Sequence, residues 1–180
     1  VLIEEDEDRE ARDGETTTLA ATYGFQIGAS GYLNVTGEYK DRADTNRSGY
    51  DPRRQFPTIS GASDPREFTF ERLSHRYGDA ETKDVNLFVN AGTDITEAVE
   101  FYAFGSYGKR EGESAGFYRR AIDARNRNYS ASTTTFVPFY PEGFLPLITS
   151  DIEDYSLAAG LRGDVGGWNW DLSHVYGHNA

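Results

Sequence analysis

The chain has 180 residues, 30 acidic and 18 basic side chains, a formal net charge of −12, and neither cysteine nor methionine. So negative a charge argues against nucleic acid as a partner, and the lack of cysteine excludes disulfides and thiolate metal sites. No apolar run reaches the roughly 18 residues of a membrane-spanning helix. Transmembrane strands are not excluded, because they need only about 9–11 residues of alternating character.

The N-terminal segment, 1–15, is a run of charged residues and predicts a solvated loop. Its carboxylates are of the kind that calcium prefers, but the spacing of Glu4, Glu5, Asp6 and Asp8 matches no calcium-binding loop motif.

A first hairpin is predicted over 16–40, where apolar residues occupy every second position on both sides of "GASG". We expect a three-residue loop, Ala29 to Gly31, with Gly31 at positive φ. Phe25 would then face Val35, and Tyr23 would face Gly37, which places both apolar sets on one face.

Long polar segments, 41–81 and 109–151, separate two further hairpins that are predicted over 82–108 and 152–178. The second hairpin turns through "GTDITEA", residues 92–98, and the third turns at Gly166-Gly167. The third register sets Leu161 opposite Leu172, Leu157 opposite Tyr176, Gly163 opposite Trp170 and Arg162 opposite Asp171. In two places, Tyr23 over Gly37 and Trp170 over Gly163, we expect a large ring to cover a strand glycine.

Three features favour lipid over a protein core as the medium of the apolar face. Short turns alternate with long polar loops, as in outer-membrane barrels. The opposite face is too polar for a core. Aromatic residues of the type found at membrane interfaces lie near the expected strand ends, namely Tyr39, Tyr107, Tyr155, Trp168, Trp170 and Tyr176. The predicted fold is all-β, an antiparallel up-and-down meander of about six strands within a larger transmembrane β-barrel. His174 is the one misfit on the lipid side.

Three segments resemble barrel segments of TonB-dependent outer-membrane receptors: "ATYGFQIGASGYLNVTGEYKDRADTNRSG", "AFGSYGKREGESAGFYRRA" and "FYPEGFLPLITSDIEDYSLAAGLRGDVGGWNWDLSHVYGHN". The resemblance implies a barrel of 22 strands that is closed by a plug domain and imports scarce nutrients, such as ferric siderophores, with energy from the TonB complex. No plug and no TonB box are visible, and six strands cannot close a barrel. We therefore expect a single partial-barrel domain, a fragment whose partners are outer-membrane lipid, the remaining strands, the plug and, through the plug, TonB.

No catalytic or metal-binding constellation occurs, so an enzyme and a bound cofactor are not expected. His75, His174 and His178 lack the spacing of metal ligands. A small-molecule ligand would bind the long loops, where the candidates are Tyr118, Arg119, Arg120, Tyr140 and Phe144. The alternative is that "YPEGFLP" only packs one loop against another.

The predicted function is therefore import through a TonB-dependent receptor in the outer membrane of a Gram-negative bacterium. Two alternatives remain open at this point. One is a porin-like passive channel, which needs no plug. The other is a soluble carbohydrate-binding or adhesive β-protein.

Overall fold

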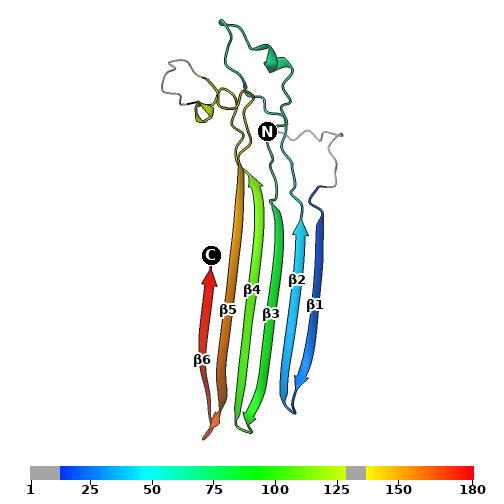
Figure 1. The fold of residues 1–180 in the computed structure, drawn as a ribbon, viewed down its shortest axis with the longest axis vertical. Coiled ribbons are helices and arrows are strands. Elements are labelled where there is room, and N and C mark those ends of the chain that lie inside the picture. Colours follow the sequence, from blue (N-terminus) through cyan, green and yellow to red (C-terminus); the bar gives the residue numbers. More distant parts are fainter. Residues whose placement is uncertain (1–12, 129–136) are drawn as a thin grey trace. The chain divides into compact units, whose positions relative to one another are not determined.

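In the computed structural model, which describes residues 13–128 and 137–180, six antiparallel strands form one sheet in the order β1-β2-β3-β4-β5-β6 (Figure 1). Their bounds are β1 Thr16–Ile27, β2 Gly31–Arg42, β3 Glu81–Thr96, β4 Val99–Ala115, β5 Leu147–Val165 and β6 Trp168–Asn179. Two short 3₁₀ helices, η1 (Pro65–Phe68) and η2 (Ala124–Asn126), lie in the long loops. The all-β, up-and-down meander of six strands is confirmed. Within the described residues, no helix is long and apolar enough to cross a membrane.

Two compact units make up the chain. The strand unit comprises Glu15–Ala43, Glu81–Gly112 and Ser150–Ala180. The loop unit comprises the described residues of Val1–Gly14, Asp44–Ala80 and Glu113–Thr149. The segment 1–12, with its acidic cluster, lies outside the described residues.

The strands of the second hairpin are longer than predicted. β3 continues through Gly92 to Thr96, and the turn before β4 is only Glu97 and Ala98 rather than "GTDITEA". Gly92 is a strand residue that faces Tyr32, whose ring lies 2.8 Å from where a Cβ on Gly92 would be. The β-branched residues that follow Gly92 favour continued strand, which is why the turn comes later. β4 and β5 likewise extend beyond the predicted limits at 108 and 152.

The predicted register of the first hairpin is wrong by two residues. Phe25 pairs with Leu33 and Tyr23 with Val35. The turn begins at Gly28, which has φ 63°, whereas Gly31 is the first residue of β2. The expected cover of Gly37 by Tyr23 is also wrong, because a Cβ there would meet nothing within 4 Å. Since the slip is two residues, both apolar sets still share one face.

The third hairpin has the predicted register. Leu161 pairs with Leu172, Leu157 with Tyr176, Gly163 with Trp170 and Arg162 with Asp171. Gly166 and Gly167 have φ of 58° and 82°, the positive values that a two-residue type I′ turn requires. Trp170 does cover Gly163, since its ring carbon Cζ2 lies 3.2 Å from where a Cβ would be. Although Arg162 faces Asp171, its ion pair is with Glu100, at 2.7 Å.

Registers and side-chain contacts divide the strand unit into two faces. In β4 and β5, even-numbered residues contact one another on one face. Arg162 pairs with Glu100, and the hydroxyl oxygens of Ser106 and Ser156 lie 2.8 Å apart. In β6 the numbering is reversed, because odd residues of β5 pair with even residues of β6. The opposite side, here called the apolar face, carries Leu19, Ala21, Tyr23, Phe25 and Ile27 of β1, Leu33, Val35 and Tyr39 of β2, Val85, Leu87, Val89 and Ala91 of β3, Val99, Phe101, Ala103 and Tyr107 of β4, Tyr155, Leu157, Ala159 and Leu161 of β5, and Trp168, Trp170, Leu172 and Tyr176 of β6. His174 lies on this face too, opposite Ala159.

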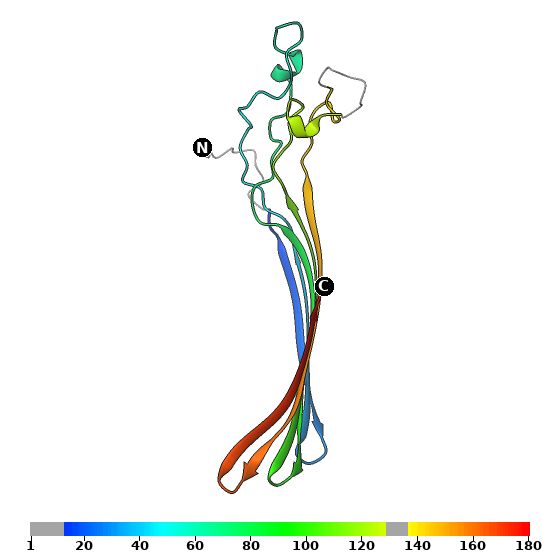
Figure 2. The same cartoon turned by 90° about the vertical axis from the view of Figure 1, so that its left-hand side faces the viewer.

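The apolar face is not covered by a second layer. Viewed from the side, the strands form one twisted layer (Figure 2). Trp168 is 79% exposed and Leu172 is 71% exposed. Among the described residues, the buried apolar side chains are Phe56, Tyr118, Ala121 and Ala158, and only Ala158 belongs to the strand unit. This sheet therefore has no hydrophobic core of its own.

The Gly166-Gly167 turn gives a stability prediction. Replacing Gly167 with Ala forces a Cβ into left-handed backbone and is expected to lower the free energy of unfolding by about 1–2 kcal/mol. Urea denaturation of the chain folded in detergent micelles measures this. Gly177→Ala is the matched control, because Gly177 lies in β6 at ordinary φ with no atom closer than 4.0 Å to a new Cβ. Equal effects of the two substitutions would contradict the turn assignment.

Candidate functional site

The loop unit has a small core of its own. Gln55 and Phe56 are fully buried. The Phe56 ring packs against Phe70, with centroids 5.4 Å apart, and the Arg66 guanidinium carbon lies 4.2 Å from its centroid. Backbone N–H groups of Gln55 and Phe56 donate to one carboxylate oxygen of Glu67 at 2.8 and 2.7 Å. The first long loop, 43–80, is thus held by contacts between residues that are distant in sequence.

Two Asp-Pro-Arg tripeptides, 51–53 and 64–66, adopt the same local structure. In each, the aspartate accepts hydrogen bonds from the arginine backbone N–H and from its guanidinium. The closest ion-pair distances are 2.6 Å for Asp51 with Arg53 and 2.7 Å for Asp64 with Arg66. Proline between them fixes φ near −65°, which turns the arginine back toward the carboxylate. The repeated tripeptide is a sequence signal that the predictions above did not use.

The pKa values of these carboxylates follow from the same contacts. Burial alone would raise the pKa of Asp51, but hydrogen bonds from the Arg53 guanidinium and N–H hold it well below its ordinary value. Hydrogen bonds from Arg66 lower the pKa of Asp64. At the start of the loop unit, the Arg47 guanidinium and the Asn46 N–H lower the pKa of Asp13 to about 2. A carboxylate with a lowered folded-state pKa contributes stability that is complete above pH ~4 and is lost as the pH falls through the lowered value.

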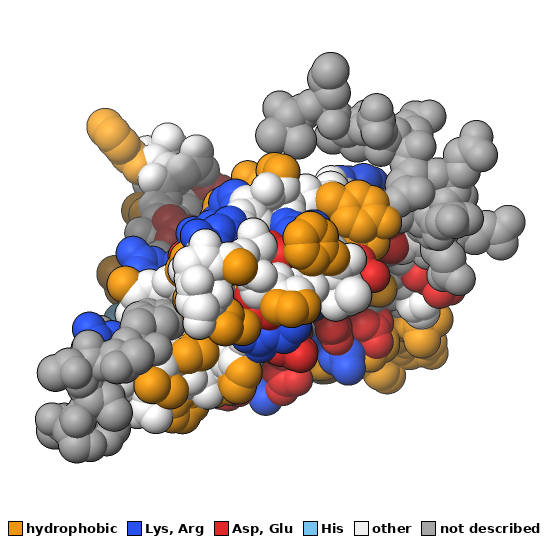
Figure 3. Space-filling view, turned by 90° about the horizontal axis from the view of Figure 1, so that it is seen from above, with side chains coloured by type: hydrophobic (Ala, Val, Ile, Leu, Met, Phe, Trp, Pro, Cys, Tyr) orange, Lys and Arg blue, Asp and Glu red, His pale blue; other side chains and the backbone are white. Residues whose placement is uncertain are grey.

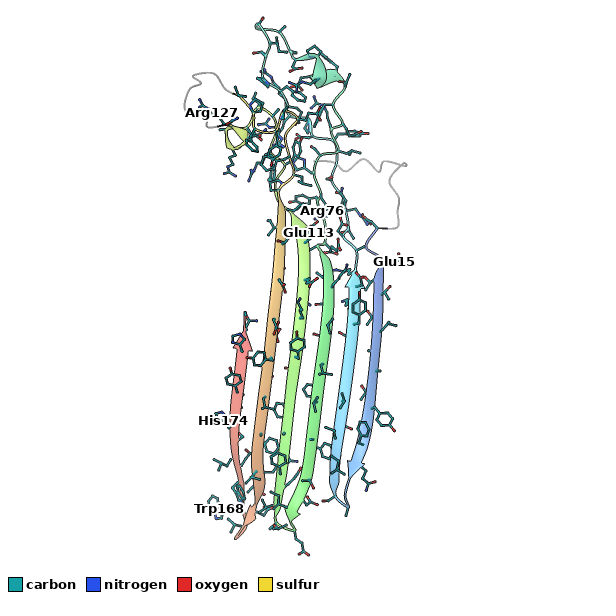
Figure 4. All side chains as sticks on the ribbon, viewed as in Figure 1. Glu15, Arg76, Glu113, Arg127, Trp168 and His174 are labelled. Carbon is teal, nitrogen blue, oxygen red and sulfur yellow. The ribbon has the colours of Figure 1, made fainter. Side chains whose placement is uncertain are left out.

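The second long loop, 116–146, packs on the first. The Ile122 N–H donates to the Gln55 carbonyl at 3.1 Å, and the Arg120 guanidinium donates to the Arg54 carbonyl at 2.9 Å. Arg120 also contacts the Asp123 carboxylate at 2.7 Å. Arg76 of the first loop also contacts Glu113, near the end of β4, at 3.2 Å (Figure 4). Backbone and charge contacts therefore join the two loops, together with ring contacts of Phe70 and His75 with Tyr118.

The predicted ligand-binding residues all lie within this unit, but most of them have packing roles. Tyr118 is buried and donates from its hydroxyl to the Glu142 carbonyl at 2.6 Å. Arg119 and Phe144 exchange two backbone hydrogen bonds, both at 2.8 Å. The Tyr140 backbone bonds to the buried side chain of Asn126 through both N–H and carbonyl. This geometry favours the packing alternative for "YPEGFLP".

An exposed surface remains beside these contacts. The Tyr140 ring, 46% exposed, lies 5.0 Å from Phe139 and 4.7 Å from Phe144, centroid to centroid. Arg119, Arg125 and Arg127 have no ion pair with any carboxylate of the described residues. The rings of Phe139, Tyr140 and Phe144, together with Arg119, whose backbone pairs with that of Phe144, are here called the aromatic–arginine surface. A guanidinium group can bind an anionic ligand through charge-assisted hydrogen bonds, and an exposed ring can stack on a planar one. In the space-filling view, hydrophobic side chains are interspersed with charged ones (Figure 3).

The predicted interface aromatics lie on the apolar face, but not all at strand ends. Tyr107 and Tyr155 lie well inside β4 and β5, because both strands continue past them. Past these two tyrosines, toward the long loops, the side chains on this face change from apolar to charged. The charged residues are Asp41, Glu81, Lys83, Lys109, Glu111, Asp151 and Glu153. Trp168 and Trp170 lie at the opposite limit, beside the Gly166-Gly167 turn (Figure 4). The apolar face is therefore a band with tryptophan at one border and tyrosine, then charge, at the other.

No group of three or more histidine, aspartate or glutamate side chains within residues 13–128 and 137–180 is arranged to hold a metal ion.

Comparison with protein-family models, curated proteins and solved structures finds no match to this chain. The resemblance to TonB-dependent receptors therefore depends on the sequence segments quoted above.

Glu67 gives a prediction for the loop unit. Glu67→Ala removes the acceptor of the Gln55 and Phe56 N–H groups and leaves Arg72 without its carboxylate. We expect the free energy of local opening to fall by about 3 kcal/mol. Hydrogen exchange at the amides of Gln55 and Phe56 measures it. Glu71→Ala is the control, since Glu71 is exposed and its carboxylate accepts a local hydrogen bond from the Leu73 N–H, at 3.2 Å. Unchanged protection in the Glu67 variant would show that the carboxylate does not hold this core.

Proposed function

We propose that the chain is part of a transmembrane β-barrel in the outer membrane of a Gram-negative bacterium, and that the barrel is a TonB-dependent receptor importing a scarce nutrient such as a ferric siderophore. In this proposal the strand unit is a section of the barrel wall. The loop unit contributes to the surface that captures the ligand. Bond chemistry plays no part in the role of this chain.

The bounded apolar band is the observation that carries the membrane assignment. Eight residue steps separate Trp168 from Tyr176, which is about 27 Å along the strand and about 21 Å along the membrane normal at a strand tilt of about 40°. Outer-membrane barrels have an apolar band of about 25 Å between aromatic girdles, and an interior that is polar. The opposite face fits a wet interior, with Glu38, Asn86, Glu100, Arg162 and Asp171 among its side chains.

The sheet edges support membership of a larger barrel. Among the residues that the structure describes, β1 and β6 each pair with a single neighbour. In hydrocarbon, an unpaired backbone edge costs several kcal/mol for each N–H or C=O group, so a spanning sheet must close. The partners of these edges in the proposal are further strands of the same barrel, and the plug implied by the resemblance would occupy the interior.

The loop unit supports a receptor over a passive pore. Its buried contacts hold Arg119 and Tyr140 in fixed backbone positions, so the aromatic–arginine surface is preorganised. A porin-like channel is the alternative. In planar bilayers, the barrel that contains these strands would conduct ions continuously if it were an open porin, whereas a plugged receptor would not.

Lipid contact is the direct test of the band. Leu172 and Ser173 are adjacent on opposite faces of β6, and Leu157 and Ser156 form an equivalent pair on β5. The chain has no cysteine, so each position can carry one bimane-labelled cysteine in turn. In liposomes with brominated acyl chains, we expect strong quenching after Leu172→Cys and Leu157→Cys, and weak quenching after Ser173→Cys and Ser156→Cys.

The neighbouring serine positions serve as controls for depth and labelling. Equal quenching within each pair would contradict a lipid-facing band. The labelled strands are tested within the barrel that contains them. If that protein stays in the aqueous phase and shows no quenching at any position, the result would favour the soluble carbohydrate-binding or adhesive protein.

A further inference from the structure

His75 lies where separate stretches of the loop unit converge. Its side chain is 15% exposed. The imidazole packs against the rings of Phe117 and Tyr118, with centroids 5.2 and 5.8 Å away. Its backbone carbonyl accepts hydrogen bonds from the Asn46 amide and the Ser48 hydroxyl. This one residue therefore contacts both long loops.

The neighbouring arginine determines which form of the imidazole fits. Nη2 of Arg53 lies 3.4 Å from Nε2 of His75. A guanidinium group can only donate, so Nε2 must present its lone pair and the imidazole must be neutral. The position of Arg53 is fixed from two sides, by its contacts with both carboxylate oxygens of Asp51 and by the Phe117 ring, 5.4 Å from its guanidinium carbon. A proton added to Nε2 would face this cation directly.

Of the other charged groups around the ring, Asp51 favours the protonated form, but burial of the imidazole against Phe117 and Tyr118 is the larger effect and favours the neutral form. Nδ1 of His75 lies 4.0 Å from Oδ2 of Asp51, but that carboxylate is already paired with Arg53. From the second loop, Tyr118 contacts the ring, and burial followed by the charges of Glu142 and Asp51 raises its pKa, so it stays neutral. Asp123 acts on Arg53 rather than on the imidazole.

We infer that the neutral imidazole of His75 holds the two long loops together and that its protonation releases them, so that the loop unit opens in acid. Segments 46–53 and 117–118 would then separate. Arg119, next to Tyr118, would move with them, and the aromatic–arginine surface would lose its fixed shape. All the groups involved belong to the loop unit, so the inference does not depend on insertion of the strand unit in a membrane.

The pH window follows from the groups that titrate. Burial lowers the pKa of His75, with Asp51 opposing the shift and Arg53 adding to it. A group with a lowered folded-state pKa contributes stability that is complete above its ordinary value, near 6.5 for histidine, and is lost as the pH falls through the lowered value. Asp51, Asp64, Glu67 and Asp123 all have lowered pKa values and remain ionised in that window.

Hydrogen exchange of the full chain in detergent micelles tests the inference. The Ile122 N–H, bonded to the Gln55 carbonyl, reports separation of the loops. After correction for the intrinsic pH dependence of exchange, we expect its protection factor to fall severalfold between pH 7.5 and pH 5. In His75→Gln, whose amide oxygen can accept from Arg53 but cannot be protonated, protection should stay constant. His174→Gln is the matched control in the strand unit and should behave as the unsubstituted chain.

A second measurement needs no variant. Nitrogen NMR of the imidazoles should show His75 as the Nδ1–H tautomer at pH 7.5, with a pKa below the ordinary value of histidine. Constant protection down to pH 5 in the unsubstituted chain would overturn the inference, as would an equal fall in the His75→Gln variant. If the lipid-contact test failed while exchange of the Ile122 N–H depended on pH as expected, the membrane proposal would be wrong and the inference about His75 would stand.

Discussion

Lateral hydrogen bonding in a single layer is the constraint on which the rest of this structure depends. Each inner strand satisfies its backbone groups through two neighbours, so the sheet needs no second layer for its polar atoms. The same arrangement gives its side chains nothing to pack against. Burying one Leu or Phe is worth roughly 1.5–3 kcal/mol. For Leu19, Phe25, Leu157 and Leu172 this contribution depends entirely on the medium that meets the apolar face. The stability of the strand unit is therefore set by its surroundings.

The loop unit is stabilised in the opposite way. Among its described residues, the buried apolar side chains are Phe56, Tyr118 and Ala121. Carboxylates that each accept several hydrogen bonds fix its shape. Such charge-assisted hydrogen bonds are directional. They therefore restrict the backbone to one conformation more strictly than apolar contacts do. A loop built in this manner keeps its surface residues in place before any ligand arrives. It is also sensitive to protonation, because its most important contacts are ionic.

Period-two alternation made the six strands and the third hairpin predictable, because Gly166-Gly167 allows only one tight turn. The sequence did not determine the register of the first hairpin, because both Gly28 and Gly31 could form the turn. The two resulting registers differ by two residues and place the same apolar side chains on one face. The turn at Glu97-Ala98 was missed because neither residue is a turn former and Gly92 suggested an earlier one. The five candidate ligand residues lie outside the strands, and their packing roles were not predictable. Tyr118 is buried by Phe70 and His75, which are distant in sequence, and no periodicity connects them.

The two-residue difference in the first hairpin has a consequence for how such a chain can diverge. Inserting or deleting a pair of residues near a turn slides one strand along its neighbour and returns every side chain to its original side. An insertion of one residue instead inverts the strand or must be absorbed as a bulge. Related chains with this sheet are therefore expected to differ in hairpin length by even numbers, while the long loops can change length freely.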